Sequence, residues 1–338
     1  MLLVDALYVN YGGAIILLRY LFEELQNEHI EFFALIDSRC DEEFNSLRYV
    51  EYRGASMAAR KAFYKQHKND FSTILCFGNV PPPIKMNAKV YTYLHNINLL
   101  NIPAMLPWKR KLKDFIKQRL IDFYGMNTDS WIVQTKNTKN ELKRHLCSGR
   151  KDVFVLPFFR LNDRLKELRK IKDGREDYAL IGELSYPRGH GTILDVWEEL
   201  HKRGYDFTLH LTVSHNSERQ ISYCNRVREL QSRGVQIINH GFVSFSEVIE
   251  IYKKSKAIVY PSLNESLGLS VIEAIEAGCD VLISDLPYAY AICKPSKVFA
   301  PRSVDSIADA IIKYDGGDRT RSVLNVDNKI EQLIGLLK

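Results

Sequence analysis

Two glutamates eight residues apart, Glu265 and Glu273, lie in the segment with the clearest chemical content. The apolar run at 257–260 before them predicts a buried strand of a parallel sheet. Gly268 precedes a predicted helix, and a helix start offers unpaired backbone N–H groups and the positive end of the helix dipole. Such a start binds phosphate, whereas carboxylates accept hydrogen bonds from hydroxyl groups. The pattern therefore predicts a site for a ligand that carries both phosphate and sugar hydroxyls.

The same two glutamates could also form an ordinary solvated helix face, with Glu273 about two turns into a helix at 267–277. Short motifs of this kind produce many false positives. The surroundings favour the binding site, because a strand precedes the pair, Gly278 follows the helix, and a second apolar strand at 280–284 comes next.

The elements that must position these residues alternate between apolar strands and helical segments, which predicts an α/β fold with parallel sheets. Helices are expected between the strands, at 14–27, 55–68, 107–124 and 136–147, then at 190–203, 218–233, 245–254 and 303–314. The expected strands lie at 2–9, 31–36, 72–77, 88–93, 130–134 and 153–156, then at 178–181, 207–212, 235–239 and 257–260.

We expect two domains, because 338 residues exceed the usual size of one domain. Residues 158–177 are charge-rich and lack strand character, so we predict the interdomain linker there. The predicted N-terminal domain covers 1–157, the C-terminal domain covers 178–315, and 316–338 ends in a helix.

The segment 260–278 resembles the donor-site signature of glycosyltransferase family four. That resemblance implies the GT-B fold, with two Rossmann-like domains whose parallel sheets face one another across a cleft, and transfer with retained anomeric configuration. It implies that Glu265 contacts the donor sugar and Glu273 the ribose, and that the phosphates lie on the backbone of Leu267, Gly268 and Leu269.

The start of the second predicted domain carries the next part of the resemblance. The family has a basic residue directly after a glycine, here Gly182, and another five positions later, and the two clamp the pyrophosphate. Arg188 matches the second position, whereas Glu183 stands at the first, where a carboxylate repels phosphate. Either Glu183 turns away from the ligand, or another cation such as Arg160 or Arg164 takes its place.

Further residues are expected at the site through the same resemblance. The backbone near Val243 would hold the nucleobase, although a helix cap at Ser244 or Ser246, with Glu247 in the first turn, also explains this segment. The paired glycines Gly12 and Gly13, with Asn10 before them, form a strand-to-helix turn that would face donor and acceptor.

His95 follows an apolar strand, and the carboxyl ends of parallel strands are where α/β sheets bind ligands. A structural histidine is the alternative, but the resemblance implies a histidine here close to the reacting sugar. Asn79 holds the same position after the preceding strand and Asn96 follows His95, so both are expected on the acceptor side, with a plain turn as the alternative for Asn79.

No Asp-x-Asp triplet occurs in the chain, so we expect neither a metal nor a cofactor. Six cysteines are scattered without a Cys-x-x-Cys pair, which favours free thiols. The net charge of +6 allows anionic partners without requiring them, and no nucleic-acid-binding motif is present. We expect no signal peptide and no membrane span, and hence a cytoplasmic protein.

The segment 108–124 combines apolar residues at helical spacing with six Lys or Arg against two Asp. A basic amphipathic helix of this kind can lie on an anionic membrane at the inner face of the cell envelope. The alternative is a helix that packs on its own domain and exposes its polar face.

The resemblance implies a metal-independent, retaining glycosyltransferase that moves a hexose-type sugar from a nucleotide donor, with UDP favoured over GDP. Glu265, His95 and Arg188 are the expected catalytic residues. A saccharide acceptor, lipid-linked as in O-antigen or capsule assembly, is the expected partner. A sugar-nucleotide epimerase or hydrolase on the same fold, and a catalytically silent binding module, remain as alternatives.

Overall fold

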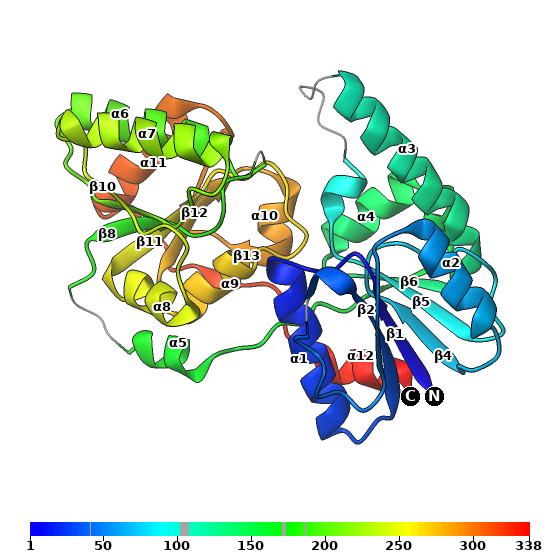
Figure 1. The fold of residues 1–338 in the computed structure, drawn as a ribbon. Coiled ribbons are helices and arrows are strands. Elements are labelled where there is room, and N and C mark those ends of the chain that lie inside the picture. Colours follow the sequence, from blue (N-terminus) through cyan, green and yellow to red (C-terminus); the bar gives the residue numbers. More distant parts are fainter. Residues whose placement is uncertain (41, 102–107, 171–173, 186) are drawn as a thin grey trace. The chain divides into compact units, whose positions relative to one another are not determined.

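The computed structural model describes residues 1–40, 42–101, 108–170, 174–185 and 187–338. The chain divides into two compact units (Figure 1). The N-terminal unit contains Met1–Arg160 together with Asp327–Lys338, and the C-terminal unit contains Leu161–Val326. Each unit is an α/β structure built on a parallel sheet, as the alternation of strands and helices predicts.

The described residues of the N-terminal unit form a seven-stranded sheet in the order β3-β2-β1-β4-β5-β6-β7. Every neighbouring pair is parallel. The strands are nearly all apolar, as expected for strands covered on both faces. Their bounds are β1 Leu2–Ala6, β2 Phe32–Asp37, β3 Val50–Arg53, β4 Thr73–Cys76, β5 Lys89–Leu94, β6 Ser130–Val133 and β7 Asp152–Val155.

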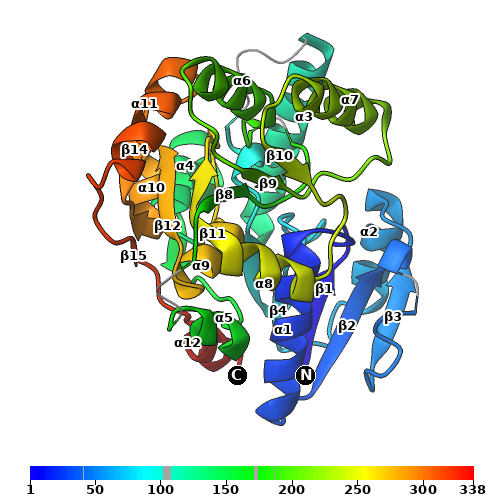
Figure 2. The same ribbon diagram turned by 90° about the vertical axis from the view of Figure 1, so that its left-hand side faces the viewer.

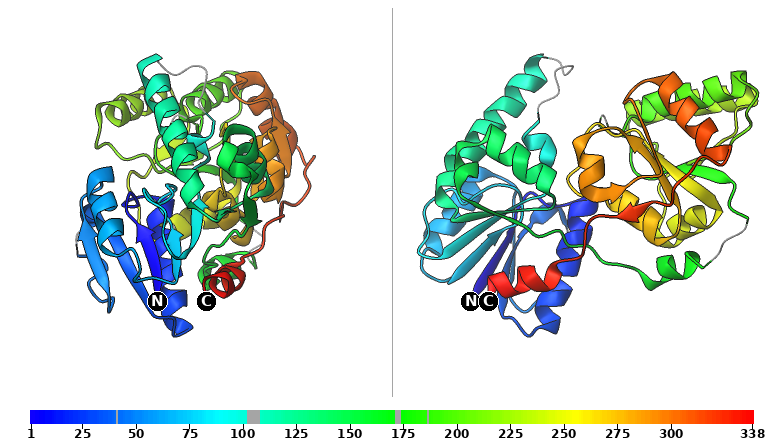
Figure 3. Two further views of the ribbon diagram at one scale, coloured as in Figure 1. Left: turned by 90° about the vertical axis from the view of Figure 1, so that its right-hand side faces the viewer. Right: turned by 180° about the vertical axis from the view of Figure 1, so that it is seen from behind.

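The helices of this unit include one from the far end of the chain, α12, which contacts α1 and β4 (Figure 3). Its apolar side chains Ile330, Leu333, Ile334 and Leu337 are buried. The helices are α1 Gly13–Asn27, α2 Met57–Gln66, α3 Trp108–Tyr124, α4 Lys136–His145 and α12 Ile330–Leu337, with 3-10 turns η1 Ser38–Cys40, η2 Ile97–Leu99, η3 Gly125–Asn127 and η4 Cys147–Arg150.

The described residues of the C-terminal unit form a six-stranded parallel sheet in the order β10-β9-β8-β11-β12-β14. A short antiparallel pair, β13 with β15, lies beside it. The bounds are β8 Asp177–Leu180, β9 Leu209–Leu211, β10 Ile237–Asn239, β11 Ser255–Tyr260, β12 Asp280–Ser284, β13 Cys293–Lys294, β14 Lys297–Phe299 and β15 Val323–Leu324.

Helices cover both faces of this second sheet, with α6, α7 and α11 on one face and α8 and α9 on the other (Figures 1 and 2). The helices are α5 Asp163–Leu168, α6 His190–Lys202, α7 Glu218–Ser232, α8 Phe245–Lys254, α9 Leu269–Glu276, α10 Pro287–Ile292 and α11 Val304–Asp315. Among the described residues, no helix has the length and apolar character needed to cross a membrane.

In both sheets the order of the strands reverses once. Successive strands are first added outward on one side of β1 or β8, and later strands are added outward on the other side. In open parallel sheets, ligands bind at the carboxyl ends of the strands beside such a reversal. The loops concerned follow β1 and β4 in one unit and β8 and β11 in the other. The predicted sites at Gly12, Asn79, Arg188 and Glu265 all lie on these four loops.

The boundaries of the units differ from those expected from the sequence. The charge-rich segment at 158–177 contains α5, whose Leu165 and Leu168 are buried, so most of it belongs to the C-terminal unit. Asn162 caps α5 by accepting a hydrogen bond from the Arg164 N–H at 2.9 Å. The final helix begins at Ile330 and belongs to the N-terminal unit, because its apolar face packs there.

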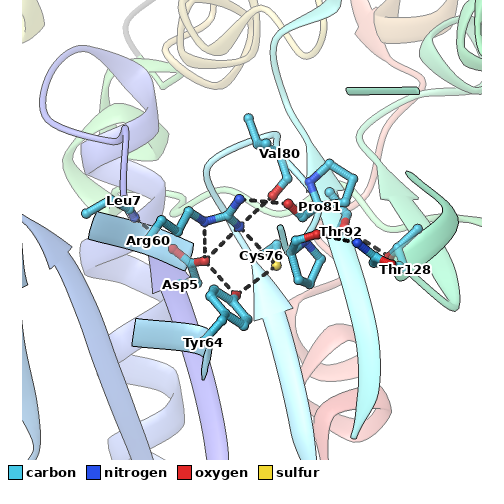
Figure 4. A network of polar contacts seen from close by, with 11 residues as sticks. Asp5, Leu7, Arg60, Tyr64, Cys76, Val80, Pro81, Thr92 and Thr128 are labelled. Carbon is cyan, nitrogen blue, oxygen red and sulfur yellow. Dashed lines mark hydrogen bonds and ion pairs between the residues drawn. The ribbon is translucent and has the colours of Figure 1, made fainter. Parts of the chain in front are cut away.

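A buried polar cluster fixes the two loops at the reversal of the N-terminal sheet (Figure 4). Asp5 and Arg60 are each 1% exposed, and the Arg60 Nε donates to Asp5 at 2.7 Å. The Tyr64 hydroxyl donates to the same carboxylate oxygen at 2.6 Å. Arg60 also donates to the carbonyls of Val80 and Pro81, each at 2.7 Å. The loop that carries Asn79 is therefore tied to the end of β1.

Candidate functional site

Arg188 and Glu265 lie together in the C-terminal unit, although 77 positions of sequence separate them. The Arg188 Nε stands 3.6 Å from the Glu265 carboxylate, and the two side chains are 30% and 16% exposed. The nearby Tyr260 hydroxyl and the Glu265 carboxylate raise the pKa of the Arg188 guanidinium, which stays charged. This places a fixed cation and a carboxylate acceptor at the carboxyl ends of β8 and β11.

The Glu265 carboxylate is held by the strand that precedes it. The Tyr260 hydroxyl donates to it at 2.7 Å and the Ser262 hydroxyl at 3.1 Å. Tyr288 in turn donates to the Ser262 carbonyl at 2.7 Å. The carboxylate is thus oriented before any ligand arrives, which lowers the reorganisation that binding requires.

Close packing at two glycines and one backbone hydrogen bond shape the two loops of this site. A Cβ on Gly182, at φ +129°, would overlap the Arg188 guanidinium. A Cβ on Gly189, at φ +67°, would stand 2.5 Å from the Pro261 carbonyl oxygen. The Leu263 N–H donates to the Pro187 carbonyl at 2.7 Å. Only glycine fits at these two positions, and the close approach lets Arg188 reach Glu265.

Gly182 is also held from both sides of its peptide. Its N–H donates to the Thr212 hydroxyl at 2.8 Å, and its carbonyl accepts from the His190 Nε2 at 3.1 Å. Burial lowers the pKa of His190 to about 4, so this ring is neutral at physiological pH. The loop after β8 is therefore rigid at the position that supports Arg188.

Glu273 lies just over one turn into α9, not two, because the helix begins at Leu269. Burial raises the pKa of Glu273 to about 7, against the opposing effects of Tyr252 and Arg188. The Tyr252 hydroxyl stands 3.4 Å from its carboxylate. A carboxyl group that titrates near neutrality within the field of Arg188 is a mark of a functional site.

The start of α9 has the geometry expected of a phosphate site. Gly268 precedes the helix in the left-handed conformation at φ +67°. As a glycine, it has no side chain that could cap the helix. The N–H groups of Leu269 and Ser270 begin the helix, where no earlier turn supplies acceptors, whereas the Val271 N–H already donates to the Gly268 carbonyl at 2.9 Å. Leu267 is buried and anchors the turn, whereas Leu269 is partly exposed.

Glu183, the departure from the family pattern, contacts the loop after β9. Its carboxylate accepts from the Gln220 amide at 2.9 Å and from the Ser214 N–H at 3.4 Å. These contacts match the first of the two possibilities, a side chain turned to other partners. Of the substitute cations, Arg160 pairs with Glu23 in the N-terminal unit, and Arg164 donates to Ser246 at 3.1 Å.

Val243 is partly buried on the loop between β10 and α8, next to Phe242, which is 82% exposed. Asn239 holds this loop, because its side-chain oxygen accepts from the Val213 N–H at 2.9 Å and from the Gly241 N–H at 3.4 Å. The predicted cap of α8 is confirmed as a capping box of Ser244 and Glu247. An exposed aromatic ring beside this loop is available to stack on a flat ligand.

In the N-terminal unit, Asn79 joins the ends of β4 and β5. Its side-chain oxygen accepts from the His95 N–H at 2.8 Å and from the Asn96 N–H at 2.9 Å. It adopts φ +66°, which is uncommon outside glycine. Asn96 is exposed and caps η2, with its oxygen 3.2 Å from the Asn98 N–H. Asn79 is therefore a structural clamp for the loop that carries His95.

The same clamp determines which nitrogen of His95 carries the proton. Since the Asn79 oxygen is used by two N–H groups, its NH₂ group faces the His95 Nε2 at 3.1 Å and donates to it. Burial lowers the pKa of His95 to about 4, so the ring is neutral. The proton then resides on Nδ1, a buried atom with no partner among the described residues.

Asn10 and Gly12 lie in the turn between β1 and α1, and Gly13 is the first residue of α1. The turn begins after Ala6, earlier than the strand expected at 2–9, because Asp5 accepts from the Leu7 N–H at 3.1 Å and Tyr8 has φ +86°. Gly12 caps α1 at φ +68°, and a Cβ there would meet nothing within 4 Å. The N-terminus of α1 is thus open. In the described residues, no group of three or more His, Cys, Asp or Glu side chains is arranged to hold a metal ion.

A comparison with known families identifies the C-terminal unit. Residues 162–322 match the glycosyl transferases group 1. The match covers just under half of the chain and makes the C-terminal unit similar to this glycosyltransferase family. It includes Gly182, Arg188, Val243, Glu265, Gly268 and Glu273, so every donor-site residue predicted in the C-terminal unit lies within the matched segment.

The curated relatives of this chain are distant. It is 24% identical over 160 residues to the serotype-specific mannosyltransferase WbdA of Escherichia coli, covering 47% of the chain and 20% of WbdA. It is 24% identical over 164 residues to the O-antigen chain mannosyltransferase RfbU of Salmonella typhimurium, covering 43% of each. The chain therefore spans about a fifth of WbdA and less than half of RfbU.

Solved structures establish the GT-B fold of this chain. Sucrose-phosphate synthase of Thermosynechococcus elongatus has a TM-score of 0.69 at 16% identity, covering 94% of the chain and 90% of that protein. Anabaena Alr3699/HepE in complex with UDP and glucose also has a TM-score of 0.69, at 12% identity, covering 99% and 94%. At these identities the likeness concerns the fold.

Sequence reasoning missed the tyrosines that hold the two glutamates. Tyr260 supports Glu265, and Tyr252 contacts Glu273. Both are buried, and both were counted only as apolar positions of a strand and a helix. The signal was available for Tyr260, because a hydroxyl at the last position of a strand points to the edge where ligands bind.

Proposed function

We propose that the protein is a retaining glycosyltransferase that moves a hexose-type sugar from a nucleotide donor, UDP rather than GDP, to a saccharide acceptor. The observation that carries this proposal is the cluster of Arg188, Glu265, Glu273 and the open start of α9 at the reversal of one parallel sheet. The cluster offers one cation and free N–H groups for a diphosphate, and two carboxylates for hydroxyls. The match of 162–322 to the glycosyl transferases group 1 and the GT-B fold support it.

In the proposed reaction, an acceptor hydroxyl bonds to the anomeric carbon while the bond from that carbon to the diphosphate breaks. The leaving diphosphate gains negative charge and takes up the hydroxyl proton. Arg188 and the N-terminus of α9 meet that charge, which is the usual way in which fixed dipoles and cations lower such barriers. Glu265 orients the sugar, and Glu273 accepts from the ribose. His95, whose ring is neutral, is a further catalytic candidate that the family resemblance implies.

We further propose that the diphosphate is stabilised without a metal ion, so that transfer continues in excess EDTA. Arg188 and the helix start supply the charge that a divalent cation would otherwise supply. If EDTA abolishes turnover and magnesium restores it, this account of the leaving group is wrong.

The acceptor that we propose is a lipid-linked saccharide of cell-surface polysaccharide assembly, met by a cytoplasmic enzyme at the inner face of the membrane. The names of three relatives support this class: WbdA is serotype-specific, RfbU acts on the O-antigen chain, and AmsD of Erwinia amylovora is an amylovoran biosynthesis glycosyltransferase.

The deciding experiment is a panel of UDP- and GDP-sugars, screened first for thermal stabilisation and then for turnover with and without a saccharide acceptor. A donor at 100 times its Kd adds about 2.7 kcal/mol of stability. Transfer that requires acceptor supports the proposal. Conversion of the donor without acceptor identifies an epimerase or hydrolase, and binding without any turnover identifies a silent binding module.

A further inference from the structure

Helix α3 packs on its unit in the opposite sense to an ordinary amphipathic helix. Ile121 and Gln118 face inward, at 4% and 5% exposure. Ile121 joins a buried cluster with Leu94 and Trp131, and Gln118 donates to the Leu100 carbonyl at 2.6 Å. Arg119 adds a hydrogen bond to the His145 carbonyl at 2.9 Å, so the contacts that anchor the helix are both apolar and polar.

The apolar stripe of α3 lies on the surface instead. Its members recur at helical spacing and are each 46–70% exposed: Trp108, Leu112, Phe115, Ile116, Leu120 and Phe123. An apolar stripe normally faces the core, since burying one such side chain stabilises a protein by about 1.5–3 kcal/mol. A stripe of this size in water marks a surface that binds another apolar phase. The expectation of a helix packed through its apolar face is thus wrong.

The charges of α3 are arranged around this stripe. The acidic residues Asp114 and Asp122 have side chains only 18% and 12% exposed and are paired with Lys117 and Arg119. Lys109 and Lys113 are exposed beside the stripe. In the described part of the helix, the carboxylates are withdrawn and the cations surround the apolar side chains. A partner with an apolar interior and an anionic surface complements both features.

We propose that α3 binds the surface of an anionic phospholipid bilayer, lying in its plane with the apolar stripe among the acyl chains and the lysines at the phosphate level. A 17-residue helix with this distribution suits an in-plane position. This inference adds the membrane partner to the proposed function. It stands on α3 alone, so either can fail without the other.

Tryptophan fluorescence offers a direct test, because Trp108 is 70% exposed whereas Trp131 and Trp197 are at most 1% exposed. Vesicles containing phosphatidylglycerol should shift the emission of the full chain to the blue, and brominated lipid should quench it. Pure phosphatidylcholine vesicles should bind far more weakly. Trp108→Phe should remove the shift while the protein still sediments with anionic vesicles.

Matched variants separate the two contributions. Leu112→Ser with Phe115→Ser should lower the partition coefficient about a hundredfold. Lys109→Gln with Lys113→Gln should lower it about fivefold for each lysine, on anionic vesicles alone. Lys61→Gln with Lys65→Gln, exposed on α2, is the control and should leave it unchanged.

Two outcomes overturn the inference. One is the absence of any shift or sedimentation with anionic vesicles. The other is a lipid-free dimer that Leu112→Ser with Phe115→Ser dissociates, which would make the stripe an interface between two copies. Transfer to a water-soluble saccharide should be equal in all these variants, so a failure of lipid binding is distinguishable from a failure of the proposed function.

Discussion

At the scale of single residues, the site depends on how each charge is held. Arg188 lies against Gly182 and pairs with Glu265, while Glu183 is occupied by Gln220 and Ser214. Although these two residues lie only five positions apart, they thus have different partners. In the proposed function Arg188 meets the diphosphate, whereas Glu183 supports a neighbouring loop.

Arg188→Ala should reduce turnover by about two to three orders of magnitude, because it removes the cation that meets the charge on the leaving diphosphate. Glu183→Ala should leave turnover within a few fold, since its carboxylate is engaged elsewhere. Parallel measurement of donor affinity and turnover for both variants tests the assignment. Loss of activity in Glu183→Ala with a tolerated Arg188→Ala would mean that Glu183 has the direct role.

Glu273 should make stability depend on pH in a defined direction. Its pKa is about 7 in the folded protein against 4.5 ordinarily, so between these values the folded state holds a proton that the unfolded state has lost. Stability from this group is complete below the lower value and falls by about 3 kcal/mol as pH rises through the higher one. The difference in unfolding free energy between Glu273→Gln and the parent protein should therefore grow from pH 5 to pH 8. A constant difference would place the pKa of Glu273 elsewhere.

At the scale of elements, the loops at each sheet reversal are fixed by contacts between strand ends. Asn79 joins β4 to β5, Arg60 joins the loop of Asn79 to β1, and the Leu263–Pro187 hydrogen bond joins the loops after β11 and β8. Because these contacts run between the ends of neighbouring strands, the two sheets determine where His95 and Arg188 lie.

Asn79→Asp should change the protonation of His95 without removing the acceptor for the two backbone N–H groups. A carboxylate accepts where the amide donated, so the proton of His95 should move to Nε2 and its pKa should rise. ¹⁵N chemical shifts of the His95 ring measure the tautomer directly. An unchanged ring would show that Asn79 does not set it. Asn79→Ala, which leaves two N–H groups without this acceptor, should cost about 1–3 kcal/mol of stability.

The element pattern was largely predictable from the sequence, and the exceptions share a cause. Apolar runs such as 257–260 predict buried parallel strands because those strands are covered on both faces. The edge strands β3 and β14 were not predicted, because β3 carries Glu51 and Arg53, β14 carries Lys297, and neither shows the apolar run of a buried strand. The outward direction of the α3 stripe was not predictable, because periodicity gives the width of an apolar face and not the side on which a helix packs.

At the scale of the whole molecule, the chain builds its first unit from both of its ends. Leu333→Ala on α12 should destabilise the N-terminal unit by about 2–5 kcal/mol, since Leu333 is fully buried there. Hydrogen exchange should rise in 1–160 and 327–338 and stay unchanged in 161–326. Gln332→Ala, exposed on the same helix, is the control. Uniformly raised exchange would mean that the two units unfold together.

The placement of α12 also sets an order of events during synthesis. Residues 161–326 are continuous in sequence, so this unit is complete once it leaves the ribosome. The unit that is translated first lacks α12 until residues 330–337 emerge, although domains usually fold in the order of translation. Until then the surface of α1 and β4 that α12 covers is exposed, and a chain released before 330 would keep that surface open to chaperones and proteases.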